Sequence, residues 1–383
     1  MSVTAAKGFT AAGIAAGIKE NGNPDLALVV NNGPSLAAAG VFTSNRVKAA
    51  PVLWSEQVLK GGLVSAVVLN SGGANACTGP KGFQDTHATA EKAAGTLGLD
   101  AGEVAVASTG LIGVLLPMDK LLPGIETVAA QLSEHGGEKA AIAIKTTDTV
   151  HKTSVAEGDG WTVGGMAKGA GMLAPGLATM LVVLTTDADL DSETLDKALR
   201  AATRVTFDRV DSDGCMSTND TVLLLSSGAS GITPGYEEFA EAVRKVCDDL
   251  GQQLVRDAEG AGKDIRIEVV GAATEADAVE VGRSIARNNL LKCAIHGEDP
   301  NWGRVLSAIG TTKAAFEADR LNVAINGVWV CRNGGVGEDR DNVDMRYREV
   351  HIVADLAAGS ETATIWTNDL TAEYVHENSA YSS

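Results

Sequence analysis

Short, strongly apolar stretches alternate along the chain with stretches in which apolar residues recur at helical spacing. The apolar stretches end in turn residues such as Asn-Asn-Gly, Ser-Gly-Gly and Thr-Gly, a pattern typical of buried β-strands. The other stretches have the spacing of amphipathic helices. Expected strands are residues 26–30, 64–70, 103–109, 179–188, 221–227 and 265–273, and expected helices are 82–98, 118–133, 192–204, 236–257 and 275–289. The alternation predicts a mixed α/β (α+β) chain, with a last part rich in strands.

Length and charge limit the classes of protein that the chain can belong to. Its 383 residues suffice for two domains or one large composite domain. The 31 basic and 49 acidic residues give a net charge of −18, which repels phosphate backbones and argues against nucleic-acid binding. The sequence contains no polybasic run, no apolar stretch of roughly 18 to 20 residues and no signal-peptide pattern at its start. We therefore expect a cytoplasmic protein.

Cysteine and histidine residues give no sign of a metal site. The five Cys residues are an odd number, widely spaced and without a C-x-x-C pair, so we expect small reduced thiols and neither a disulfide framework nor a zinc site. The six His residues form no H-E-x-x-H pattern. We expect no metal.

One junction stands out chemically. Residues 164–178 read GGMAKGAGMLAPGLA, are interpreted as rich in turns, and run directly into an apolar strand that begins at Thr179. A hydroxyl placed there could attack the carbonyl carbon of Ala178, and hydrolysis of the resulting ester would leave Thr179 with a free amine of pKa about 8, able to act as a base. Taken alone, however, these residues fit better an ordinary strand that follows a Pro-Gly turn.

Motifs along nearly the whole chain alter that balance, because together they resemble the ornithine acetyltransferase (glutamate N-acetyltransferase) family. The motifs are GFTAAGI (8–14), GVFTSNRVKAAPV (40–52), LNSGGANACTG (69–79), STGLIG (108–113), KGAGMLAPGLATML (168–181), STNDT (217–221), EGAGK (259–263), DPNWGR (299–304), TNDLT (367–371) and HENSAYSS (376–383). The DSDGCM segment before STNDT departs slightly from the form expected in many members, with little consequence for the core chemistry.

The resemblance implies a self-cleaving fold with a Thr nucleophile, of the ornithine acetyltransferase or DmpA-like type, with layered sheets flanked by helices. Cleavage between Ala178 and Thr179 would give an alpha chain, 1–178, and a beta chain, 179–383. Thr179 would then carry an acetyl group from N2-acetylornithine to glutamate. The resemblance also implies a heterotetramer of two alpha and two beta chains and no metal or organic cofactor. It leaves open whether acetyl-CoA is a second acetyl donor.

Two positions are implied as the oxyanion hole of this reaction. Acyl transfer passes through a tetrahedral oxyanion that needs preorganised donors, and the resemblance places them at Thr109 and Gly110. The pair ends an expected strand, where Gly allows N–H groups to point outward. Without the resemblance, the same pair would be interpreted as an ordinary turn at the end of a strand.

The substrate carries a carboxylate and an amine, so its site needs a cation and an anion. The resemblance implies that Lys168, Glu259 and Thr146 contact substrate, although Thr147 beside Thr146 leaves that assignment uncertain by one position. The sequence alone would make Lys168 a solvated loop lysine and Glu259 a helix-end carboxylate. In the chain terminus, Asn378 and Ser383 are implied to fold back and bind substrate.

Other functions remain to be weighed against acetyl transfer. A faint phosphate-loop appearance of GGANACTGPKG is rejected, because Pro80 interrupts the required Gly-Lys-Ser/Thr. A self-processing amidohydrolase or aminopeptidase of related architecture would use water as the acceptor instead of glutamate. An uncleaved binding protein would stay in one piece.

Overall fold

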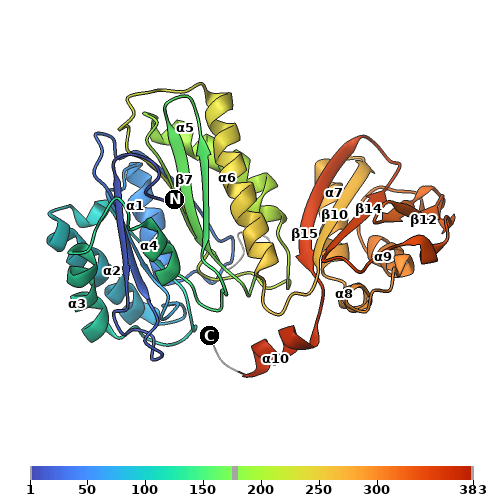
Figure 1. Ribbon diagram of the computed structural model, residues 1–383, viewed down its shortest axis with the longest axis horizontal. Helices are drawn as coiled ribbons and strands as arrows, with labels where there is room; N and C mark the ends of the chain where they lie inside the picture. Colours follow the sequence, from blue (N-terminus) through green and yellow to red (C-terminus); the bar gives the residue numbers. More distant parts are fainter. Residues whose placement is uncertain (1, 175–179, 381–383) are drawn as a thin grey trace. The chain divides into compact units, whose positions relative to one another are not determined.

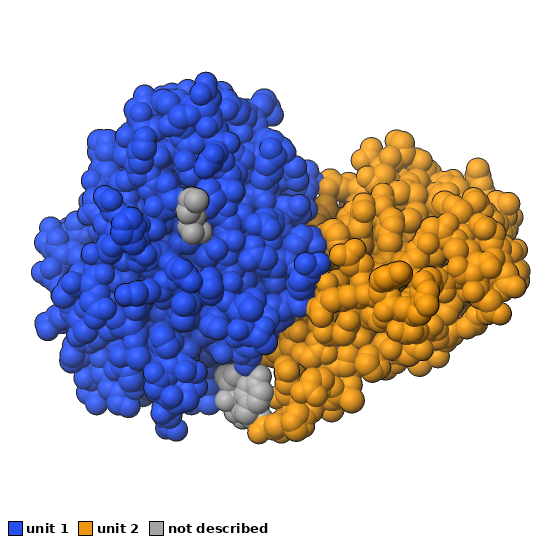
Figure 2. Space-filling view, in the orientation of Figure 1, with its two compact units in different colours: residues 1–208, 215–257, 383 blue, residues 209–214, 258–382 orange. Residues whose placement is uncertain are grey.

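The computed structural model describes residues 2–174 and 180–380, which are arranged in two units (Figures 1 and 2). Unit 1 consists of the described residues of 1–208 and 215–257, and unit 2 of those of 209–214 and 258–382. Each unit has its own sheet structure and hydrophobic core. The expectation of a mixed α/β chain is confirmed.

Unit 1 contains most of the helices and strands that the apolar pattern predicts. Its strands are β1 (Phe9–Ile14), β2 (Leu26–Asn31), β3 (Ala38–Phe42), β4 (Ala66–Asn70), β5 (Val104–Ser108), β6 (Lys152–Glu157), β7 (Thr162–Lys168), β8 (Leu181–Thr186) and β9 (Thr221–Ser226). Its helices are α1 (Ala50–Val58), α2 (Gly79–Leu97), α3 (Met118–Ala129), α4 (Gly137–Ala143), α5 (Ser192–Val205) and α6 (Tyr236–Arg256), with short 3₁₀ turns η1 (Leu59–Gly61) and η2 (Ala101–Glu103). A third turn, η3 (Phe207–Arg209), follows α5.

The described strands of unit 1 form two sheets. One has the order β1-β2-β4-β5, and the other the order β3-β9-β8-β7-β6. In the second sheet β7 and β8 are antiparallel, with Lys168 opposite Leu181, whereas β8 and β9 are parallel, with Leu181 beside Thr221. The chain on both sides of residues 175–179 therefore enters one sheet through adjacent strands.

The two sheets of unit 1 face each other across a shared apolar core. Val29 and Leu69 of the first sheet belong to the same buried cluster as Leu181 and Leu223 of the second. The outer face of the first sheet is covered by α2 and α3, and that of the second by α5 and α6 (Figure 1). The layered arrangement of sheets and flanking helices is thus confirmed. All six residues of β8 are buried, as expected for a strand covered on both faces.

The interpretation of residues 164–178 as turn-rich from their first residue is wrong in its first part. Residues 164–168 are strand and complete β7. Gly164 and Gly165 serve close packing instead of turning the chain. A Cβ on Gly164 would lie 2.3 Å from the carbonyl oxygen of Ser2, and one on Gly165 would lie 2.8 Å from the Leu184 side chain. Both distances are shorter than van der Waals contact allows.

Unit 2 is built on a mixed sheet. Its strands are β10 (Asp264–Ala272), β11 (Asn322–Ile325), β12 (Val328–Arg332), β13 (Gly335–Val336), β14 (Glu349–Asp355) and β15 (Glu361–Asn368). Its helices are α7 (Glu275–Ala286), α8 (Asn289–His296), α9 (Trp302–Ile309) and α10 (Ala372–Ala380), with turns η4 (Ala318–Arg320) and η5 (Arg340–Asn342). The order is β13-β12-β11-β14-β10-β15, in which β10 is parallel to β14 and antiparallel to β15, and α7 packs on β10 and β15. The last part of the chain is strand-rich, as predicted, but also contains α9 and α10.

Within residues 2–174 and 180–380, every helix is too short or too polar to cross a lipid bilayer.

Candidate active site

The carboxyl end of β5 carries the first two predicted site residues. Thr109 follows β5 directly and is buried, and its N–H donates to the carbonyl oxygen of Asn70 at the end of the parallel neighbour β4 (3.0 Å). Gly110 has φ +134°, and a Cβ there would lie 2.8 Å from the backbone nitrogen of Gly73. The backbone therefore requires glycine at position 110, for conformation as well as for space.

Lys168, from β7 of the other sheet of unit 1, reaches Thr109. It is the last residue of β7, its side chain is only 2 % exposed, and its Nζ donates to Oγ1 of Thr109 (3.4 Å). The alternative of a solvated loop lysine is therefore wrong. The contact brings the ends of the two sheets of unit 1 together at one buried cation and one hydroxyl.

The buried carboxylate of Asp148 organises the loop that follows α4 and bonds to the residue after Lys168. Asp148 accepts hydrogen bonds from the N–H groups of Thr146 (3.0 Å) and Gly169 (2.7 Å) and forms an ion pair with Lys152 (2.7 Å). Burial opposes its ionisation, but Lys168 and Lys152 outweigh that effect and hold the pKa of the Asp148 carboxyl far below its ordinary value. Asp148 thereby links Thr146 to the residue after Lys168.

A second lysine lies near Lys168. The Nζ of Lys19 donates to the carbonyl oxygens of Lys145 (2.6 Å) and Pro24 (3.2 Å). Burial lowers the pKa of Lys19 to about 8, Asp25 opposes this, and Lys168 lowers it further. The sequence alone gave no indication of Lys19 or Asp148, because neither belongs to a motif with an assigned role.

The predicted cleavage site lies outside the described residues. This holds for both Ala178 and Thr179. The first described residue after it is Met180, whose N–H donates to Oδ1 of Asp220 (3.2 Å) and whose carbonyl oxygen accepts from the N–H of Thr221 (3.1 Å). Asp220 is fully buried, and burial raises the pKa of its carboxyl well above the ordinary value. From the sequence, STNDT was only one of the motifs of the resemblance, and no role in the site was predicted for Asp220.

Two further predicted residues belong to unit 2 and lie together there. The side-chain nitrogen of Asn378, on α10, donates to Oε2 of Glu259 (3.0 Å). Glu259 lies three residues beyond the end of α6 and lines a cavity of about 350 Å³, together with Lys292 and Tyr374. Burial lowers the pKa of Lys292, and acidic neighbours oppose that shift. Ser383 lies outside the described residues.

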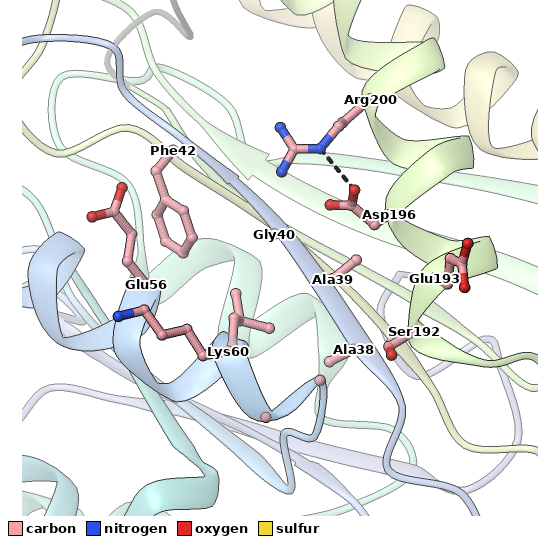
Figure 3. A pocket seen from close by; sticks show the side chains of 13 residues that line it. Ala38, Ala39, Gly40, Phe42, Glu56, Lys60, Ser192, Glu193, Asp196 and Arg200 are labelled. Carbon is pink, nitrogen blue, oxygen red and sulfur yellow. Dashed lines mark hydrogen bonds and ion pairs between the residues drawn. The ribbon is translucent and has the colours of Figure 1, made fainter.

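Unit 1 also has a surface groove of about 450 Å³ that contains none of the predicted site residues. It is bounded by β3, the end of α1 with η1, and the start of α5. Figure 3 shows its charged side chains, among them Arg200, which donates to Asp196 on the same helix (2.8 Å). Because it is lined by neither Thr109 nor Lys168, the groove is not part of the candidate active site.

Comparison with known proteins identifies the family. Residues 10–383 match the ArgJ family. The chain belongs to the ArgJ family. It is 89% identical over its full length to the arginine biosynthesis bifunctional protein ArgJ of Streptomyces avermitilis and 87% identical to that of Streptomyces coelicolor, in both cases covering 100% of each chain. Membership confirms the predicted family and the prediction of an acyltransferase enzyme.

Solved structures of the family are also similar. The ornithine acetyltransferase of Mycobacterium tuberculosis, solved with ornithine, is 60% identical and covers 47% of this chain and 96% of its own, with a TM-score of 0.45. The arginine biosynthesis bifunctional protein of Bacillus halodurans is 34% identical and covers 51% of this ArgJ-family chain and 97% of its own, with a TM-score of 0.49.

A first prediction concerns Gly110. Gly110→Ala should destabilise the protein by about 1–3 kcal/mol, because the backbone conformation is unfavourable for L-residues and the new methyl group would meet Gly73. Urea unfolding measures this. The matched control is Gly95→Ala in α2, where a Cβ meets nothing within 4 Å, and this change should stabilise by about 0.5–1 kcal/mol. Equal effects of the two substitutions would contradict the prediction.

A second prediction concerns the pH dependence of Asp148. Its folded-state pKa is depressed, so its contribution to stability is present above the unfolded pKa of about 3.9 and is lost as the pH falls further. Asp148→Asn should cost about 3–5 kcal/mol at neutral pH, because it leaves Lys152 and Lys168 less compensated. The difference from the unsubstituted protein should narrow below about pH 4. Unfolding curves from pH 7 to pH 3 test this, and a difference that stays constant with pH would contradict it.

Proposed function

We propose that this ArgJ-family chain transfers the acetyl group of N2-acetylornithine to glutamate through an acetyl-enzyme on Thr179. The observation that carries the proposal is the match to the family over residues 10–383, with relatives 89% and 87% identical that are named as arginine biosynthesis proteins. The contact between Lys168 and Thr109 supports it, because it provides a buried cation and a hydroxyl one residue before Gly110.

The chemistry proceeds in two acyl-transfer steps. The Thr179 hydroxyl attacks the acetyl carbonyl carbon while its proton passes to the free α-amine of the same residue. Donors at Thr109 and Gly110 stabilise the oxyanion, and collapse of the tetrahedral species breaks the C–N bond and releases ornithine, whose nitrogen takes the proton. The amine of glutamate then attacks the acetyl ester, which releases N-acetylglutamate and restores the Thr179 hydroxyl.

The free α-amine requires an earlier self-cleavage. In that step Thr179 Oγ1 attacks the carbonyl carbon of Ala178, the acyl group moves from nitrogen to oxygen, and water hydrolyses the ester. The products would be the chains 1–178 and 179–383. The five-stranded sheet supports their continued association, because it combines β3, β6 and β7 of the first piece with β8 and β9 of the second.

Substrate contacts, assembly and a second activity belong to the same proposal. Thr146, Lys168 and Glu259 would bind the substrate, with Asn378 and Ser383 from the chain terminus. Two copies of each piece would form a heterotetramer. The word "bifunctional" in the relatives' names supports acetyl-CoA as an additional acetyl donor.

Self-cleavage makes a direct prediction. The purified protein should give two bands on a denaturing gel, and N-terminal sequencing of the C-terminal piece should begin at Thr179. Thr179→Ala should remain a single chain, because the nucleophile of the acyl shift is lost. Thr127→Ala, at an exposed site on α3, is the control and should be cleaved normally. A piece that begins at any other residue would refute the assignment.

Acetyl transfer predicts dependence on the acceptor. Release of ornithine from N2-acetylornithine should require glutamate for turnover and should show ping-pong kinetics, because both half-reactions pass through one covalent intermediate. The assay measures ornithine and N-acetylglutamate with and without glutamate. Sustained release of acetate at an unchanged rate without glutamate would favour the hydrolase instead.

A further inference from the structure

Two side chains of the STNDT segment, residues 217–221, make three buried hydrogen bonds that the proposed mechanism does not use. The side-chain nitrogen of Asn219 donates to the carbonyl oxygens of Ala74 (2.6 Å) and Ser108 (2.8 Å). The next side chain, Asp220, accepts from the N–H of Met180 (3.2 Å). Asn219 is 4 % exposed and Asp220 is fully buried.

Two of these hydrogen bonds reach the residues next to the proposed reacting groups. Ser108 is bonded to Thr109, which begins the proposed oxyanion hole, and the nitrogen of Met180 is bonded to the carbonyl carbon of Thr179, the proposed nucleophile. The consecutive side chains of Asn219 and Asp220 are therefore hydrogen-bonded to the end of β5 in one sheet and to the start of β8 in the other. Adjacent residues thus connect the end of β5 to the start of β8, and acyl transfer is sensitive to a misplacement of its groups by about 1 Å.

The backbone of this segment is itself held firmly. The carbonyl oxygen of Asp220 accepts from the N–H of Thr43 (3.0 Å), and the N–H of Asn219 donates to Oγ of Ser217 (3.0 Å). Directly beyond Asp220, Thr221 begins β9 and its N–H bonds back to Met180. The backbone that carries Asn219 and Asp220 is thus held by the sheet.

We infer that Asn219 and Asp220 are positioning residues that set the separation between Thr179 and the Thr109–Gly110 pair, and that Asp220 acts by accepting a hydrogen bond and not by carrying charge. The inference rests on the proposed role of Thr179. The side-chain oxygen of Asp220 fixes the Met180 peptide by accepting a hydrogen bond from its N–H. A negative charge beside the new α-amine would instead favour its ammonium form, which cannot take the hydroxyl proton.

The surroundings of Asp220 agree with a neutral side chain. Burial raises the pKa of its carboxyl; hydrogen bonds from Met180 and Ser217 and the charge of Lys168 oppose this, whereas Asp208 adds to it. Its Oδ1 is the acceptor for Met180, and its Oδ2 has no hydrogen-bond partner within residues 2–174 and 180–380. A proton on Oδ2 leaves Oδ1 free to accept, and an asparagine reproduces that pattern of one acceptor and one donor group.

The test compares three substitutions in the full chain. Asp220→Asn keeps the acceptor and removes the ionisable proton, so self-cleavage and kcat should stay within about tenfold of the unsubstituted enzyme, with the same pH profile of kcat/KM. Asp220→Ala removes the acceptor, and Asn219→Asp removes the amide donor and sets a carboxylate against two carbonyl oxygens. Both should lower kcat and the cleavage rate by roughly a hundredfold, with a smaller change in KM.

Controls separate this inference from a general folding defect and from the proposed function. Asp85→Asn makes the same change at a buried aspartate on α2 that also has an oxygen without a hydrogen-bond partner among the described residues, and it should leave kcat unchanged. Circular dichroism and thermal melts check folding. A roughly hundredfold loss in folded Asp220→Asn, or full activity in Asp220→Ala, would overturn the inference. Failure of the unsubstituted protein to cleave at Thr179 would instead overturn the proposed function.

Discussion

The pairing of β7 with β8 is the constraint on which the rest of unit 1 depends. Lys168 and Leu181 face each other in the register of these antiparallel strands, so the ends of the segment 169–180 are fixed at the same edge of one sheet. β8 is buried on both faces, between the apolar core shared with the other sheet and the helices α5 and α6. A strand held by two neighbours and two layers would keep its place even after one peptide bond beside it is cut.

The same edge collects the polar groups of the site, and their burial sets their chemistry. Buried charges in proteins need partners, and Lys168 has Asp148 within electrostatic reach, while Asp148 has Lys152 and two backbone N–H groups. Removal of a single member would leave the others less compensated, although Lys152 also pairs with Asp257. In such buried surroundings a hydrogen bond counts for more than it would in water, and a donor at Gly110, as proposed above, would benefit from this.

The sequence predicted the strands and helices whose apolar pattern is continuous, such as β2, β5, α5 and α6, within a few residues. The strands that it missed in unit 1 include β1, β3, β6 and β7. In β7, Gly164 and Gly165 were interpreted as turn residues, but their role is steric and depends on the neighbouring Ser2 and Leu184. The site residues came from resemblance. The contacts of Lys168 with Thr109, Asp148 with Gly169 and Lys19 with Lys145 join residues distant in sequence, which no local pattern reveals.

Asn219 and Asp220 show why a motif can matter without touching the reacting atoms. One amide and one carboxyl on adjacent residues connect the end of β5 to the start of β8 through hydrogen bonds, whose distances and angles vary within narrow limits. The backbone beside the pair is held as well, because the N–H of Thr43 donates to the carbonyl oxygen of Asp220 and the N–H of Thr221 donates to that of Met180. The ends of these strands therefore fix the position of the Met180 peptide. In the proposed mechanism this peptide would in turn fix the position of the nucleophile.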